Sequence, residues 1–245
     1  MIPRSVRNTL LIILIASTSI SCKKNTANSP TLKGHANVSY FAKASGTGIK
    51  SVSTNKSNNV VSETAVVNWS TATIYVDKIS FVGISNSVID TTISVQKNIN
   101  LLNPNALTGI IELPSGSYKD VKVKMHLRKN GWPEMAFLLK GTFTNTNGGQ
   151  DSLLIVSSAP FEVNLGVPDI TINPSEDYNV MINFNLDKGL TGMSTATLQT
   201  ADRNGGNGAP YVIWNGNSYP AVPLPLYDKI VENWQTVATA TIIKK

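Results

Sequence analysis

Residues 178–186 read YNVMINFNL, and every second side chain in this stretch is large and apolar. The apolar residues of the alternation are Tyr178, Val180, Ile182, Phe184 and Leu186. A period of two places successive side chains on opposite faces of an extended chain. The stretch therefore predicts a β-strand with one face against a core and the other face in water.

The same period of two recurs through most of the chain between residues 62 and 190. Val121, Val123, Met125 and Leu127 form one such set, and shorter sets occupy residues 72–76 and 161–165. Eight or nine short strands of this kind suit one immunoglobulin-like antiparallel β-sandwich. Ser, Thr and Asn make up 73 of the 245 residues and only 15% of residues are charged, a composition that excludes a coiled coil or a charged helical nucleic-acid binder.

Turn signals refine this interpretation. A one-residue shift of the alternation at Asp77 and Lys78 predicts a β-bulge, and NTNGG at residues 145–149 predicts a hairpin turn. Pro114 and Pro174 each precede, by four residues, a Tyr that opens an alternating strand. Both segments are typical of a tyrosine corner, and they indicate either a duplicated half or two equivalent crossings in one sandwich.

The last third of the chain has a different character. Residues 201–210 read as a loop, and near-helical spacing predicts one short amphipathic helix from Leu226 through Ile230 and Trp234 to Val237. Residues 239–243 suit a closing strand. We therefore divide the chain into a signal peptide (1–21), a flexible tether (22–60), a β-sandwich domain (61–190) and a C-terminal extension with a loop and a short helix (191–245). Within the tether, NVSYFA at residues 37–42 suits a first strand.

The start of the chain has the features of an export signal. Arg4 and Arg7 precede the apolar run LLIILIA at residues 10–16, which is too short to span a bilayer. Cys22 follows a run of small or neutral residues and is the only cysteine in the chain. The segment SISCKK at residues 19–24 resembles a bacterial lipobox, and this resemblance implies cleavage before Cys22 and acylation of that residue. A cleaved secretory peptide with an incidental thiol is the alternative.

The net charge of +6 is confined to the beginning of the chain. Every charged residue before Glu63 is basic, whereas 15 acidic and 13 basic residues occupy positions 63–245. The basic segment suits a tether near anionic lipid head groups or a solvated linker. We expect no nucleic-acid partner, because the remainder of the chain is slightly acidic.

One longer pattern carries a family resemblance. Leu101 and Leu102 are followed by IELPSGSYKDV at residues 111–121, and this arrangement resembles uncharacterised lipoproteins of the Bacteroidota, with DUF4382-like β-sandwich domains as the nearest named group. Residues 178–190 are similar to the closing strand and turn of that group. The resemblance implies a β-sandwich in a lipoprotein and carries no established activity.

The residues offer little for catalysis. His35 and His126 are the only histidines, and His126 lies between basic residues on a polar strand face, which is a poor place for the base of a catalytic triad. The calcium-like stretch at residues 202–208 has its glycines in the wrong register. We therefore expect no catalytic residue, no metal and no cofactor, although a pair of acids brought together by the fold stays open.

Two groups of residues are candidates for ligand binding. Lys122 and Lys124 share a strand face and could bind a polyanion. The alternatives are a solvated strand face, or an edge strand whose lysines prevent aggregation. Trp132, Trp214 and Tyr211 lie in predicted loops and suit stacking on sugar rings, with packing against the end of the sandwich as the alternative.

These observations predict a lipid-anchored protein of the cell envelope with a non-enzymatic role in binding or assembly. Its expected partners are the membrane, through the anchor, and a glycan or an envelope protein. The alternatives are a fimbria-like structural subunit that pairs by strand addition and an unrecognised glycan hydrolase. The expected location is the outer membrane, facing the periplasm, because KKN at residues 23–25 lacks acidic residues; the cell surface stays open.

Overall fold

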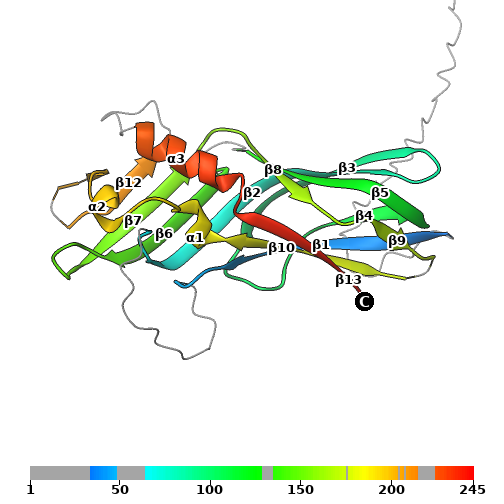
Figure 1. The fold of residues 1–245 in the computed structure, drawn as a ribbon, viewed down its shortest axis with the longest axis horizontal. Helices are drawn as coiled ribbons and strands as arrows, with labels where there is room; N and C mark the ends of the chain where they lie inside the picture. The colour runs from blue at the N-terminus through cyan, green and yellow to red at the C-terminus, as the bar shows by residue number, and fades with distance from the viewer. Residues whose placement is uncertain are drawn as a thin grey trace, which may run out of the picture. The chain divides into compact units, whose positions relative to one another are not determined.

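The computed structural model describes residues 34–48, 64–128, 135–174, 176–203, 205–206, 208–214 and 224–245. It consists of two β-sheets packed face to face, with a short helix near the C-terminus (Figure 1). The predicted mainly-β class, the sandwich and the C-terminal helix are confirmed. In the described residues, no helix is long and apolar enough to cross a membrane.

The larger sheet is organised by one long strand, β2 (Val67–Ile84). β3 (Val88–Asn100) pairs along one edge of β2. β6 (Phe137–Thr144) and then β5 (Gly116–Leu127) pair along its other edge. The pairing changes register between Val76 and Lys78, which confirms the predicted bulge and marks the point where β2 passes from one partner to the next.

The remaining strands extend this sheet on both sides. β7 (Gln150–Ser157) joins β6 through the predicted hairpin turn, and β12 (Tyr211–Trp214) and β11 (Asp202–Arg203) follow β7. β8 (Phe161–Gly166) and β9 (Ile170–Ile172) pair with β5. β5 is therefore an interior strand, and the interpretation of its lysines as guards of a sheet edge is wrong.

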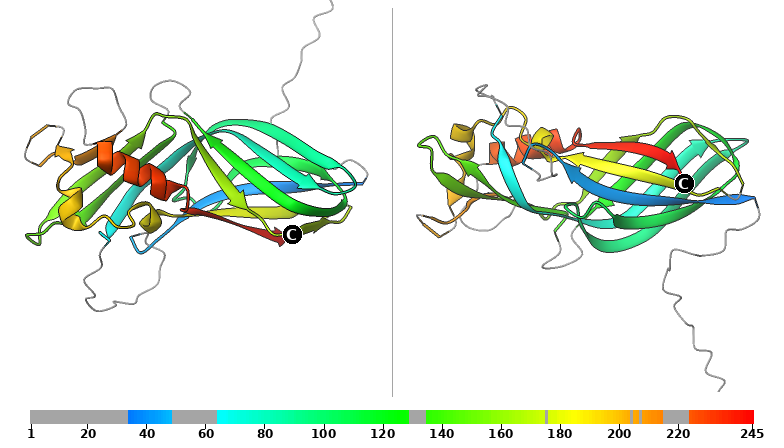
Figure 2. Two further views of the ribbon diagram at one scale, coloured as in Figure 1. Left: turned by 45° about the horizontal axis from the view of Figure 1, so that its top comes forward. Right: turned by 90° about the horizontal axis from the view of Figure 1, so that it is seen from below.

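The smaller sheet has the strand order β13, β10, β1, β4. The bounds of its strands are β1 (His35–Ser45), β4 (Ala106–Pro114), β10 (Tyr178–Asn185) and β13 (Ala238–Lys244). β1 runs parallel to β10 and antiparallel to β4, and Figure 2 shows this sheet lying against the larger one.

The expected domain boundaries differ from the observed ones. Residues 35–45 form an interior strand instead of part of a tether, and β13 is a strand of the smaller sheet instead of part of an extension. The compact unit runs from Thr31 to Lys245. The local alternation of β1 is short and flanked by lysines and polar residues, so its partners are not visible from the sequence nearby.

The described residues also contain three short helices: α1 (Leu186–Gly189), α2 (Thr195–Leu198) and α3 (Leu224–Trp234). α3 buries Leu226, Ile230 and Trp234, as its spacing predicted. The indole of Trp234 stacks on the ring of Phe137 in β6 with centroids 4.3 Å apart. α3 therefore covers the part of the larger sheet that the smaller sheet does not.

Both predicted tyrosine corners are present, one at the start of a strand in each sheet. The hydroxyl of Tyr118 donates to the carbonyl of Pro114 at 2.7 Å. The hydroxyl of Tyr178 accepts from the Asn173 N–H at 3.0 Å and lies 3.2 Å from the Thr171 carbonyl. Each bond closes the backbone turn before the strand, as expected for two crossings of one sandwich.

Two buried tyrosines provide a matched test of the corner. Tyr118→Phe removes the partner of the Pro114 carbonyl and should lower the free energy of unfolding by about 1–2 kcal/mol. The buried hydroxyl of Tyr40 has no hydrogen-bond partner in the described residues, so Tyr40→Phe should be neutral or stabilising. Urea unfolding of residues 31–245 measures both. An equal loss in the two variants would contradict the role of the Tyr118 bond.

A second prediction concerns Glu176, whose pKa is lowered to about 2, chiefly by the hydrogen bond from Lys244 on β13 and also by Asn173. Its stabilising contribution is present above the unfolded value of 4.5 and is lost as the pH falls through about 2. Lys244→Met should raise this pKa toward its ordinary value in an NMR titration, whereas Lys229→Met should not. An unchanged Glu176 pKa in Lys244→Met would show that β13 does not hold this carboxylate.

Candidate functional site

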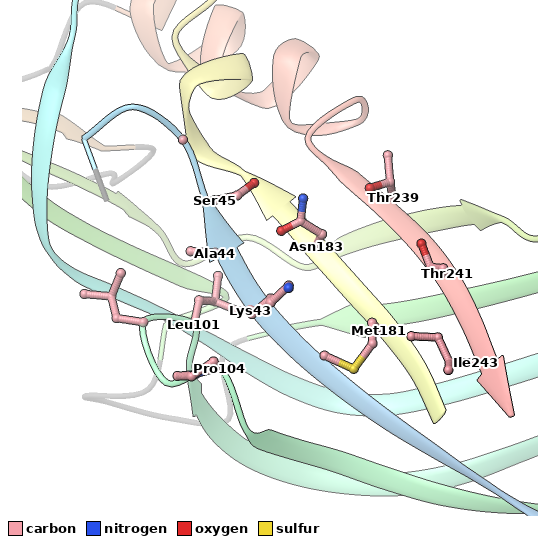
Figure 3. Close-up of a pocket in the computed structure, with 12 residues that line it drawn as sticks. Lys43, Ala44, Ser45, Leu101, Pro104, Met181, Asn183, Thr239, Thr241 and Ile243 are labelled. Carbon is pink, nitrogen blue, oxygen red and sulfur yellow. The ribbon is translucent and has the colours of Figure 1, made fainter. Parts of the chain in front are cut away.

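A groove of about 680 Å³ lies on the solvent-facing side of the smaller sheet. It crosses β1, β10 and β13 and is closed on one side by the connection between β3 and β4 (Figure 3). We call it the sheet groove. Its lining residues are Lys43, Ala44, Ser45, Gly46, Leu101, Leu102, Pro104, Met181, Asn183, Thr239, Thr241 and Ile243.

Strand register sets the floor of the groove. Lys43 is the partner of Asn183, which is in turn the partner of Thr239. The three side chains form a row across three strands on one face, because residues paired in register share a face. The adjacent row, Phe41, Met181 and Thr241, is more apolar. The groove therefore presents an ammonium, an amide and a hydroxyl beside an apolar strip.

The wall formed by the β3–β4 connection is held by backbone hydrogen bonds. The Ala44 N–H donates to the carbonyl of Leu101 at 2.7 Å, and the Ala106 N–H donates to the carbonyl of Asn103 at 3.2 Å. Leu101 is buried, so it anchors the wall in the core. Figure 3 shows Leu101 and Pro104 on one side of Lys43, with the side chains of β13 on the other. The wall of the groove is thus held by the chain's own hydrogen bonds and core packing.

The polar groups of the groove are incompletely satisfied. Lys43 is half-buried and forms no ion pair with any described residue. The Oδ1 atom of Asn183 is buried with no hydrogen-bond partner in the described part of the chain. Buried polar atoms are usually paired, since an unmade hydrogen bond there costs about 1–3 kcal/mol. A polar molecule bound in the groove would supply a partner for the Lys43 ammonium.

Lys122 and Lys124 lie on the exposed face of β5, away from the sheet groove. Glu162 on β8 approaches this face, with its carboxylate 3.0 Å from Lys124 Nζ and 3.4 Å from His126 Nδ1. The hydrogen bond from Lys124 holds the pKa of Glu162 below its usual range. Burial lowers the pKa of His126, although Glu162 opposes this shift. The expected positive ridge is therefore partly neutralised.

Tyr211 and Trp214 do not lie in a loop, contrary to expectation, because both belong to β12. Tyr211 is buried against Phe143, and the Arg203 guanidinium lies 4.0 Å above its ring. A three-residue offset along a strand places Trp214 on the opposite face. The two side chains cannot form one stacking platform. Cys22 and Trp132 lie outside the described residues.

The described binding candidates from the sequence therefore lie apart from one another, and the sheet groove is lined by different residues. Its floor joins residues near positions 43, 183 and 239, which only the fold brings together. The sequence does contain one indication of this face. In residues 178–185, asparagines alternate with buried apolar side chains, which marks the solvent-facing side of β10. The described residues contain no group of three or more His, Cys, Asp or Glu side chains placed to hold a metal ion.

Comparison of the chain with family models, curated proteins and solved structures finds no match. The functional argument therefore rests on the geometry of the groove and on the sequence.

Proposed function

We propose that this chain is a lipid-anchored binding protein of the cell envelope and that its sheet groove holds an acidic glycan. The observation that carries the proposal is the half-buried Lys43 ammonium, free of any described ion-pair partner, beside an unsatisfied Asn183 amide in a preformed groove. The resemblance to DUF4382-like lipoproteins and the lipobox-like segment at Cys22 support the location.

The chemistry of the lining favours a hydroxyl-rich, negatively charged ligand. Lys43 is the only charged residue among the described side chains of the groove. Amide and hydroxyl groups of Asn183, Thr239 and Thr241 repeat across strands about 4.8 Å apart, which suits the ring hydroxyls of successive sugars. Met181 and Ile243 supply apolar contact for the carbon faces of the rings. A cationic ligand would meet no carboxylate there.

The same lining supports binding in preference to catalysis. It contains no carboxylate, histidine or thiol, whereas glycoside hydrolysis ordinarily uses a pair of carboxyl groups. The Lys124–Glu162 pair lies on the other sheet, and neither Lys244 nor Glu176, which pair at the end of β13, lines the groove.

Strand addition is a second candidate function, and one observation favours it. β13 lies at an edge of the smaller sheet and, among the described strands, pairs only with β10. Its inward side chains, Ala238, Ala240 and Ile242, are only partly buried, so the strand gains little from the core. Size-exclusion chromatography of residues 31–245 that showed concentration-dependent polymers would favour this function over glycan binding.

Cys22→Ser tests the anchor. In a bacterial host that acylates lipoproteins, the wild-type chain should partition into the detergent phase of Triton X-114 and Cys22→Ser should remain in the aqueous phase, because about 0.8 kcal/mol per buried methylene makes multiple acyl chains a durable anchor. Equal partition of the two chains would contradict lipidation.

Lys43→Ala tests the groove. Residues 31–245 should bind uronic-acid oligosaccharides in calorimetry, and Lys43→Ala should weaken this binding at least tenfold, since a charge-assisted hydrogen bond contributes roughly 1.5–3 kcal/mol. Asn183→Asp, which adds a negative charge to the groove, should weaken it as well.

Lys140→Ala is the matched control, because Lys140 is exposed on β6 of the other sheet. It should bind like wild type. Uronic-acid binding that Lys43→Ala leaves intact, or an absence of binding to any oligosaccharide tested, would contradict the proposal.

A further inference from the structure

The hairpin between β2 and β3 exposes two aliphatic side chains at its tip. Ile84 is 44% exposed and Val88 is 65% exposed. They are direct cross-strand partners, so they lie side by side on one face of the hairpin. Only two other large hydrophobic residues in the described chain, Val66 and Ile243, are comparably exposed. Ile84 and Val88 are thus a local apolar tip, which we call the hairpin tip.

The hairpin tip lies at the end of the sandwich where the chain enters the fold. The Ser115 N–H donates to the carbonyl of Gly34, just before β1, at 2.8 Å. The next residue, Gly116, lies against Ser85 in the hairpin so closely that a Cβ there would be 2.7 Å from Ser85 Oγ. Figure 1 shows the β2–β3 hairpin and the beginning of β1 at the same end.

We propose that this end of the sandwich rests on the lipid bilayer that holds the Cys22 acyl chains, with Ile84 and Val88 in the bilayer interface. The inference depends on the proposed lipidation. Eleven residues separate Cys22 from Gly34, and even fully extended this segment spans only about 40 Å. The anchor therefore keeps the hairpin tip within reach of the membrane surface.

The contact is apolar and not electrostatic. Lys119, the partner of Ile84 on β5, and Lys122 are both exposed on this face. Asp90, Asp120 and Asp169 lie on the strands and turns beside them, so the lysines give no net positive charge. Binding should therefore be insensitive to anionic lipid and to salt, in contrast with a basic surface.

Two aliphatic side chains are too few to recruit a protein to a membrane, but they suffice to orient one already tethered, because the tether sets a high effective concentration. The β6–β7 turn lies at the opposite end of the larger sheet. Phe143, next to this turn, pairs with Val67, the first residue of β2, whereas Ile84 is the last residue of β2. This orientation points the β6–β7 turn away from the bilayer.

The chain permits a direct test, because acylation of Cys22 leaves no other thiol. Asn86→Cys at the hairpin tip and Asn147→Cys in the β6–β7 turn each introduce one site for an environment-sensitive NBD fluorophore; both asparagines are exposed. The full lipidated chains are reconstituted into phosphatidylcholine vesicles, with or without phosphatidylglycerol, and vesicle flotation is measured in parallel.

The NBD emission of Asn86→Cys should shift to shorter wavelength and be quenched by nitroxide-labelled lipid, equally with and without phosphatidylglycerol, while that of Asn147→Cys should not. Adding Ile84→Ser and Val88→Ser should reduce the quenching several-fold and leave flotation unchanged. Flotation with equal, water-like emission at both positions would overturn this inference alone. A wild-type chain that does not float would overturn the lipid anchor and this inference together.

Discussion

The insertion of β1 between β4 and β10 is the interaction on which the rest of the smaller sheet depends. Eight residues of β1 pair with β10 and eight pair with β4. The inward side chains Ala36, Val38, Tyr40 and Ala42 are at most 2% exposed. Without this strand, β10 and β13 would have no hydrogen-bonded connection to β4, and the core between the two sheets would be open to water on one side.

The same strand positions the binding groups. Its inward residues belong to the core, and its outward residue Lys43 lines the sheet groove. Because the side-chain period of a strand is two, a register slip of one residue would exchange these two sets. Burial of Val38 and Tyr40 therefore fixes the place of Lys43 opposite Asn183, so the energetics of the core and the geometry of the groove have one origin.

The features that the sequence predicted correctly are local ones. The alternation of residues 178–186, the bulge at Asp77, the turn at 145–149, the two tyrosine corners and the spacing of α3 each depend on side chains within a few residues of one another. These features can be predicted from sequence because residues close together in the chain determine the local backbone geometry.

The features that were missed depend on distant partners. Residues 37–42 suit a first strand, but the full strand of residues 35–45 and its interior place come from parallel pairing with residues 178–185 and antiparallel pairing with β4. β12 has four residues, too few for a period to show, and it is a strand because it adds to β7. The sheet groove combines residues from β1, β10 and β13, so no single segment of the sequence carries its pattern.

The most direct test of this account compares a chain of residues 31–245 with one of residues 61–245, which lacks β1. The account predicts that the longer chain unfolds cooperatively in urea and that the shorter chain does not, and that a synthetic peptide of residues 34–48 added to the shorter chain restores the transition. A peptide with Val38→Asp and Tyr40→Asp should not restore it. A shorter chain that unfolds with the same midpoint as the longer one, with or without peptide, would contradict the central role of β1.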